Sequence, residues 1–185
     1  IVRNDLASSI RRVADLRGRT IATSTGSVSS KTFLQMAAQT LLSANGVGPD
    51  QVRWLPTAQN WDSISGALIS KAADAVVSEE PFSSRAVRSR LGGILVDLSD
   101  PKVAAQVPGL NHIRTAICTT RTLVQAQPQK LELFVRMLRR TLVWIQSTPP
   151  EQVAQRAPVG TAEEQQEIAA LLKKMPGIFC PDGRF

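Results

Sequence analysis

The segment from residue 20 to residue 43 constrains the fold more than any other part of the sequence. Residues 20–23 form a short β-prone stretch, residues 24–30 are nearly all small, and residues 32–43 repeat apolar side chains with a helical period. A strand that leads through a short loop into a helix marks the place where open α/β sheets bind ligands. The first N–H groups of such a helix lack intrahelical partners and carry partial positive charge. The sequence therefore predicts a binding cleft for a small anionic molecule at this loop.

Strand and helix patterns alternate along the chain, which is typical of an α/β fold with a parallel sheet. The 185 residues suffice for one domain or two small lobes. Strands are predicted at residues 1–3, 20–23, 52–55, 73–77, 94–98 and 113–119, and helices at residues 32–43, 61–70, 81–91, 128–147, 151–156 and 162–174. Residues 9–15 are predicted to be a linker or helical turn, and residues 99–109 a loop.

The net charge of +7 and the pI near 10.2 raise the question of nucleic-acid binding. The arginines lie on several separate elements, however, and the sequence has no Tyr and no alternation of aromatic and basic residues that would suit base stacking. We therefore expect no nucleic-acid partner, and a basic surface that attracts anions. No apolar run is long enough to span a membrane, and a targeting signal would have to precede Ile1.

The few cysteines and the single histidine argue against metal and triad chemistry. Cys118 and Cys180 form no Cys-x-x-Cys pair, and His112 has no Asp and Ser in register, so we expect neither a metal site nor a catalytic triad. No phosphate-loop or dinucleotide-binding glycine motif occurs, and no cofactor is expected. Cys118 lies in an apolar strand pattern that predicts a small buried residue. In an oxidising compartment Cys118 could form a disulfide with Cys180, and the sequence leaves this question open.

Five motifs follow one another in an order that resembles a known family. They are Asp15-Leu16-x-Gly18-x-x-Ile21-Ala22 before a Thr-Gly-Ser loop, Leu55-Pro56-Thr57 before a helix, Ala67-Leu68-x-x-x-Ala72-x-Asp74-Ala75, Glu80-Pro81-Phe82, and a long helix that ends in Ser147-Thr-Pro149-Pro150-Glu151. Over nearly the whole chain, this order resembles the substrate-binding proteins of ABC importers for nitrate, sulfonate, taurine and thiamine precursors.

The resemblance implies an α/β fold like that of type II periplasmic binding proteins, in which two lobes enclose the ligand. Residues 1–112, with a core at 15–98, would be one nearly complete lobe. Residues 113–185 would be the crossover strand and the helices that return to the other, incomplete lobe. The family's N-terminal section is expected to lie outside this chain, and either a longer reading frame or a partner chain would supply it.

The same resemblance implies a non-catalytic receptor that captures a small polar or anionic ligand, such as a sulfonate, nitrate or taurine. The receptor would close on its ligand and deliver it to an ABC permease in the membrane, which requires that the ligand bind the closed form better than the open form. The implied location is periplasmic, or extracytoplasmic with a membrane anchor.

Nine residues are predicted to contact the ligand. The first group lies in the small-residue loop and consists of Thr25, Gly26, Ser27, Ser29 and Ser30. Hydroxyl groups there can donate hydrogen bonds to an anionic head group. Ser and Thr also cap helices routinely, and the two roles can hold at once.

The other four predicted contacts are Asn60, Trp61, Glu80 and Arg114. Trp61 offers a flat apolar wall for a ligand, or packs in the core under its helix. Glu80 accepts a hydrogen bond from a ligand amine, or is a solvated acid at a helix N-terminus. Arg114 pairs with a carboxylate or sulfonate, or lies on the surface as an ordinary arginine.

Two other classes of function stay open. One is an enzyme on the same fold, like the family's desulfinases and thiamine-pyrimidine synthases, for which Cys118 is the only plausible nucleophile. Cys118 lacks a visible activating base, which a thiol nucleophile needs. The other is the ligand-sensing domain of a regulator. A signal peptide upstream would favour the receptor, and a helix-turn-helix would favour the regulator.

Overall fold

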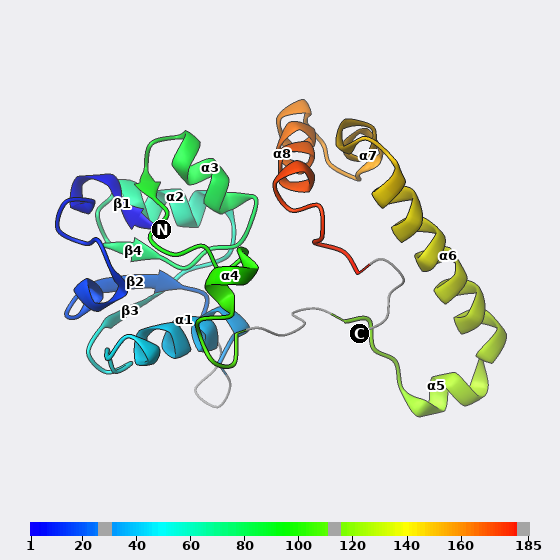
Figure 1. Cartoon of the computed structure of the whole chain (residues 1–185), viewed down its shortest axis with the longest axis horizontal. Coiled ribbons are helices and arrows are strands. Elements are labelled where there is room, and N and C mark those ends of the chain that lie inside the picture. The colour runs from blue at the N-terminus through cyan, green and yellow to red at the C-terminus, as the bar shows by residue number, and fades with distance from the viewer. Residues whose placement is uncertain (26–30, 111–115, 181–185) are drawn as a thin grey trace. The chain divides into compact units, whose positions relative to one another are not determined.

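A five-stranded mixed sheet forms the centre of the first of two units in the chain (Figure 1). The units are Ile1–His112 and Ile113–Phe185. The structure is a computed structural model that describes residues 1–25, 31–110 and 116–180. The strands are β1 (Val2–Arg3), β2 (Thr20–Thr23), β3 (Arg53–Pro56), β4 (Ala75–Val76) and β5 (Gly92–Gly93). Their order in the sheet is β3-β2-β4-β1-β5. The assignment of residues 1–112 to one lobe and of residues 113–185 to part of a second lobe stays a prediction.

The strand β2 runs parallel to both of its neighbours. Ile21 pairs with Trp54 of β3 and with Ala75 of β4, so the three strands point the same way. The strand β1 instead pairs antiparallel with β4 and β5. The carboxyl ends of β2, β3 and β4 therefore lie at one edge of the sheet.

Helices cover both faces of this sheet (Figure 1). The helix α1 (Phe33–Ala44) and the 3-10 turns η1 (Asn4–Leu6) and η2 (Val13–Leu16) lie on one face, and α2 (Trp61–Ile69) and α3 (Phe82–Arg88) lie on the other. The core of the first face contains Val2, Ile10, Val13, Leu16, Ile21, Leu42, Val47, Val52 and Ala75, and that of the second contains Ala22, Ile64, Ala67, Leu68, Ala73, Val76 and Ala86. Burial on both faces explains the nearly continuous apolar composition of the central strands.

The helix α1 begins and ends where the sequence places its signals. The hydroxyl of Thr32 accepts a hydrogen bond from the Gln35 amide at 3.1 Å, which satisfies one of the free N–H groups of the first turn. Asn45 ends the helix, and Gly46 follows with φ of +74°, a conformation that glycine adopts without strain. After α4 (Pro101–Ala104), Val107 and Leu110 pack against α1.

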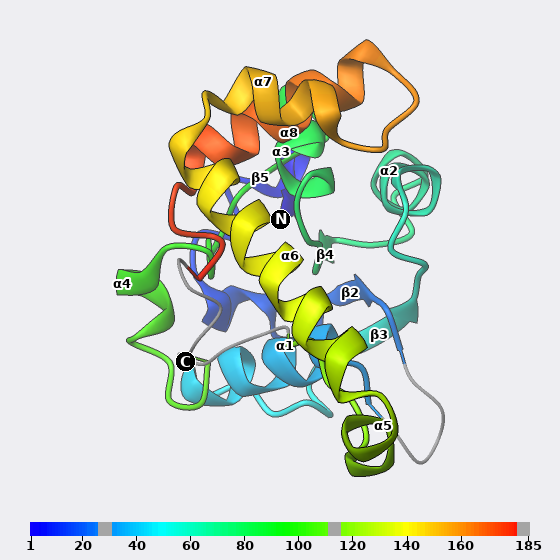
Figure 2. The same cartoon turned by 90° about the vertical axis from the view of Figure 1, so that its right-hand side faces the viewer.

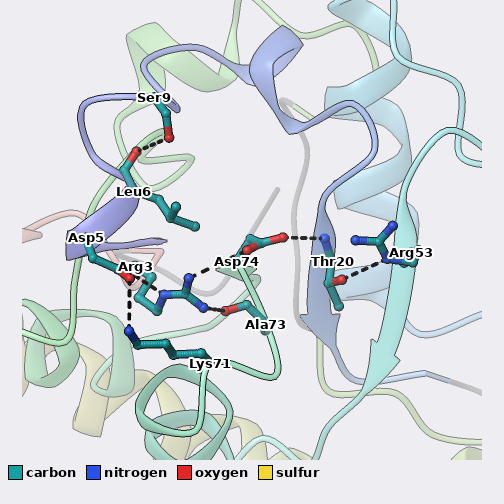
Figure 3. Close-up of polar contacts among 9 residues, drawn as sticks. All are labelled: Arg3, Asp5, Leu6, Ser9, Thr20, Arg53, Lys71, Ala73 and Asp74. Atoms are coloured by element: carbon teal, nitrogen blue, oxygen red, sulfur yellow. Dashed lines mark hydrogen bonds and ion pairs between the residues drawn. The ribbon is translucent and has the colours of Figure 1, made fainter.

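A polar network joins three strands at the edge opposite the carboxyl ends (Figure 3). The Thr20 amide donates to Asp74 Oδ2 at 2.9 Å, and the Asp74 amide donates to the Thr20 carbonyl at 2.8 Å. Arg3 Nη1 donates to the Ala73 carbonyl at 3.0 Å, and Arg3 Nη2 lies 3.8 Å from Asp74 Oδ1. Asp74, from the Asp-Ala motif of the sequence, thus fixes the start of β2 relative to β4 and β1.

The described part of the second unit is helical. Its helices are α5 (Arg121–Ala126), α6 (Pro128–Ser147), α7 (Pro150–Arg156) and α8 (Ala162–Lys174). The helices α7 and α8 lie side by side (Figure 1 and Figure 2), with an ion pair between Glu151 and Lys173. Thr161 and Glu164 form a reciprocal capping box at the start of α8.

Several sequence predictions are wrong. A strand was predicted at residues 94–98, but the strand β5 is Gly92–Gly93. Leu95 and Val96 pack against the core outside the strand. Residues 116–119 are not a strand, whereas residues 113–115 lie outside the described residues. Cys118 is therefore exposed rather than buried, and no disulfide joins it to Cys180. The helices α4 and α5 were not predicted.

Replacing Asp74 with Ala is expected to destabilise the first unit. The substitution leaves the Thr20 amide without its acceptor, which costs about 1–3 kcal/mol in the free energy of unfolding. It also removes the carboxylate beside Arg3, whose guanidinium keeps its bonds to Asp5 and to the Ala73 carbonyl. Chemical denaturation measures the effect, with the exposed Asp50→Ala as a control that changes stability by less than about 0.5 kcal/mol. Equal stability of the two variants would contradict the role of Asp74.

Asp15 is expected to contribute stability that acid removes. The Arg11 amide donates to its carboxylate at 3.0 Å, and this bond, with those from Arg12, holds the pKa of Asp15 below its ordinary value of 3.8. The contribution is complete above pH 3.8 and declines as the pH falls below that value toward the folded-state pKa. Unfolding curves of wild type and Asp15→Asn should therefore converge in acid. A stability difference that does not change between pH 6 and pH 2.5 would refute this account.

Candidate ligand-binding site

Three loops leave the carboxyl edge of the sheet and form the candidate site. They follow β2, β3 and β4, and backbone hydrogen bonds join the first residues of the loops after β3 and β4 to the end of β2. The Thr57 amide donates to the Thr23 carbonyl at 3.0 Å, and the Val77 amide donates to the Ala22 carbonyl at 2.8 Å. Because the two parallel ladders end within one residue of each other, at Thr23–Pro56 and Ala22–Val76, all three loops start at this edge.

The loop after β2 is closed partly by its own hydroxyl groups. Thr32 Oγ1 donates to the Ser24 carbonyl at 2.6 Å, and Ser24 Oγ donates to Thr32 Oγ1 at 3.2 Å. Thr25 is half-buried beside this pair. Thr32 therefore caps α1, whereas the sequence offered capping for the hydroxyl residues of the loop and placed Thr32 as the first residue of the helix. The predicted contacts Gly26, Ser27, Ser29, Ser30 and Arg114 lie outside the described residues.

Asn60 has a structural role at the start of α2. Its Oδ1 accepts a hydrogen bond from the Ser63 amide at 2.9 Å, and its backbone is extended as an N-cap requires. The side chain is exposed at the candidate edge. The capping bond occupies one lone pair of Oδ1, while the amide NH2 group can still donate to a ligand.

Trp61, the first residue of α2, forms a close pair with Arg85 of α3. The Arg85 guanidinium carbon lies 4.5 Å from the centroid of the Trp61 ring, which is a cation–π contact. Trp61 is also partly buried against the core cluster of the α2–α3 face. Sequence reasoning missed Arg85, although its place four residues after Pro81 puts it one turn into a helix that starts at the edge.

Glu80 binds the first turn of α3. Its Oε2 accepts from the Ser84 amide at 3.0 Å, and its Oε1 accepts from the Ser84 hydroxyl at 2.9 Å. A carboxylate at this place is also favoured by the partial positive charge of the helix start. The structure therefore supports the helix-terminus interpretation, and ligand contact by Glu80 stays a prediction.

Among the residues that the structure describes at this edge, two buried polar atoms make no hydrogen bond. They are Oγ1 of Thr23, the last residue of β2, and Oε1 of Gln59, which follows β3. Thr23 is 0% exposed. Sequence reasoning placed neither residue in the site, because a threonine in an apolar strand and a glutamine in a loop are unremarkable as residue types.

A basic surface on α6 is the other feature that could attract an anion. An open hollow there is lined by Glu132, Val135, Arg136, Arg139, Arg140, Val143, Trp144 and Ser147. All of these residues belong to one helix, so they supply a single wall, and Arg136 already pairs with Glu132 at 2.9 Å. The sheet edge, where three loops converge, is therefore the stronger candidate.

The described residues hold no group of three His, Cys, Asp or Glu side chains placed to bind a metal ion. Within the same residues, no helix combines the length and apolar character needed to cross a membrane.

Comparison with known proteins identifies both a family and a fold. The family model described as NMT1/THI5 like matches residues 1–152. A solved structure from Bordetella bronchiseptica RB50 is 21% identical, with a TM-score of 0.73, and the match covers 100% of this chain and 57% of that one. The alkanesulfonate-binding protein SsuA from Xanthomonas axonopodis pv. citri, bound to MOPS, is 16% identical, with a TM-score of 0.61 and coverage of 91% and 53%. No curated protein matches.

These matches confirm the predicted fold class, an α/β fold of the periplasmic-binding-protein type. The chain spans little more than half the length of the solved structures that it matches.

Replacing Asn60 tests whether capping accounts for its whole role. Asn60→Ala should lower the free energy of unfolding by about 1 kcal/mol, because the Ser63 amide loses its acceptor. Asn60→Ser, which keeps a capping oxygen, should retain most of that stability. Urea unfolding of the two variants provides the measurement, and an Ala variant as stable as wild type would show that the cap contributes nothing.

Proposed function

Because the chain belongs to the NMT1/THI5-like family, we propose that it binds a small polar solute as the substrate-binding component of an ABC importer. The predicted resemblance to such substrate-binding proteins is confirmed at the level of family and fold. The observation that carries the functional proposal is the convergence of three loops at the carboxyl edge of β2, β3 and β4. Open α/β sheets bind their ligands in this position.

The proposed ligand is a small anion or zwitterion, with a sulfonate, nitrate or taurine as the leading candidates. The loop after β2 offers hydroxyl groups and the start of the 12-residue helix α1, both of which suit an anionic group. The fold match to an alkanesulfonate-binding protein agrees with that chemistry. The proposed contacts in this loop are Thr25, Gly26, Ser27, Ser29 and Ser30.

Four further residues are proposed to line the site. Asn60 would donate from its amide, and Trp61 would supply a flat wall that Arg85 stiffens from one face. Glu80 would accept from a ligand amine at the same edge, and Arg114 would pair with an anionic group. A permease in the membrane is the proposed partner, and the proposed location is extracytoplasmic. The proposed function needs no cofactor.

Among the described residues, the contact of the Cys118 thiol is one that supplies no activating base. This exposed thiol contacts the carbonyl oxygen of Ala116 at 3.9 Å, and a carbonyl cannot remove the proton from a thiol. A nucleophilic cysteine needs a neighbouring base or positive charge to form the thiolate. The family match and the fold therefore support a receptor better than a desulfinase-like enzyme.

Thermal unfolding with a panel of small sulfonates, taurine and nitrate tests the proposal. A ligand that binds only the native state at a concentration of 100 times Kd adds about 2.7 kcal/mol of stability, so the unfolding temperature should rise with ligand concentration. Ser27→Trp and Ser29→Trp should abolish that rise without changing the unliganded unfolding temperature. Ser43→Trp, on the exposed last turn of α1, is the matched control.

Failure of every solute in the panel to raise the unfolding temperature would reject the proposed function. An undiminished rise in both loop variants would instead show that the loop after β2 does not contact the ligand.

A further inference from the structure

Buried polar atoms without hydrogen bonds are rare in folded proteins, and each such atom calls for an explanation. In the described part of this chain the buried side-chain atoms of this kind are Thr23 Oγ1 and Gln59 Oε1. Both residues belong to the carboxyl edge, where the proposed solute would bind. Two unsatisfied atoms at one edge, with the polar network around Asp74 satisfied at the opposite edge, point to a missing partner at this place.

The bonds around Gln59 show how its side chain lies. Gln59 follows β3, and its Nε2 donates to the carbonyl of Val77, which follows β4, at 3.4 Å. Because a carbonyl can only accept, the NH2 end of the amide must face Val77, and the oxygen is left without a donor. The strand β2 lies between β3 and β4, so the Gln59 side chain crosses the end of β2, where Thr23 is the last residue.

The hydrogen bond from Thr57 to Thr23 keeps these two positions together. The Thr57 amide donates to the Thr23 carbonyl at 3.0 Å, which holds the loop that carries Gln59 against the end of β2. Gln59 Oε1 can only accept a hydrogen bond, whereas the Thr23 hydroxyl can donate or accept. The complementary group is therefore one that carries hydrogen on nitrogen or oxygen.

We propose that Thr23 and Gln59 form a hydrogen-bonding subsite that selects solutes with an N–H or O–H group in addition to an anionic group. The inference rests on the proposed function, and it narrows the ligand to amino- or hydroxyalkyl anions. A ligand without the donor leaves Gln59 Oε1, which can only accept, without a partner, and sites with buried polar groups discriminate strongly against such analogues. The half-buried carboxylate of Glu80 at the same edge favours an ammonium group over a hydroxyl.

Isothermal titration of the full chain with matched sulfonates tests the selection. Taurine and propane-1-sulfonate have similar shapes, but a methyl group replaces the ammonium in the latter, and isethionate carries a hydroxyl at that position. Wild type should bind taurine at least tenfold more tightly than propane-1-sulfonate, the equivalent of about 1.4 kcal/mol, with isethionate between them. Gln59→Met and Thr23→Val should reduce this preference to less than threefold, whereas the exposed Gln106→Met should keep it.

The unliganded unfolding temperature separates a binding role from a structural one. Thr23→Val removes only a buried hydroxyl that has no partner, so it should leave this temperature unchanged or raise it. Gln59→Met also removes the hydrogen bond from Nε2 to the Val77 carbonyl, so a small decrease is expected in that variant. A lower unfolding temperature combined with an unchanged preference would show a purely structural role and overturn the inference.

The affinities of the wild-type protein for these sulfonates also test the subsite without any variant. Equal affinity for taurine and propane-1-sulfonate would overturn the subsite and leave the proposed function standing. Absence of saturable binding by any of the three sulfonates, or by nitrate, would overturn both.

Discussion

Parallel pairing of β2 with β3 on one side and β4 on the other is the constraint on which the rest of the structure depends. The register brings the last residues of the three strands to one edge, so that loops separated by tens of positions in the sequence meet there. At the opposite edge, Asp74 bonds to the first residue of β2 and lies beside Arg3 of β1 (Figure 3). One edge of the sheet is thus held by satisfied polar contacts, and the other is the edge at which we propose that the ligand binds.

The distribution of hydrogen bonds agrees with that division. Caps at Thr32 and Asn60 and the bonds from Ser84 to Glu80 fix where the three helices begin, and each of these residues lies at the carboxyl edge. Among these bonded groups, Thr23 and Gln59 each keep one buried atom unpaired. A native state that tolerates such atoms loses some stability, and binding sites are where proteins commonly accept that loss.

The sequence predicted the elements with strong local signals and failed where tertiary pairing decides. The strand Thr20–Thr23 and the helices Pro128–Ser147 and Ala162–Lys174 are confirmed at both ends, because periodicity, prolines and capping residues mark them. Ile94, Leu95 and Val96 have strand-like composition, but the short β1 pairs with the glycines just before them. The helix α4 carried a readable signal, since Asp100 precedes Pro101 and caps the Lys102 amide at 2.8 Å.

Within the candidate site, Trp61 and Glu80 were recognisable by residue type. Arg85, Thr23 and Gln59 were not, because their roles arise from contacts between separate elements that only the tertiary fold brings together.

Hydrogen exchange of backbone amides with and without taurine tests the central claim, that the carboxyl edge of the sheet is where a solute binds. The account predicts slower exchange on ligand addition in residues 24–35, 57–61 and 77–84, the segments that follow β2, β3 and β4, and no change in α8. Exchange that is unaltered in all three segments, while the ligand demonstrably binds, would place the site elsewhere and contradict the account.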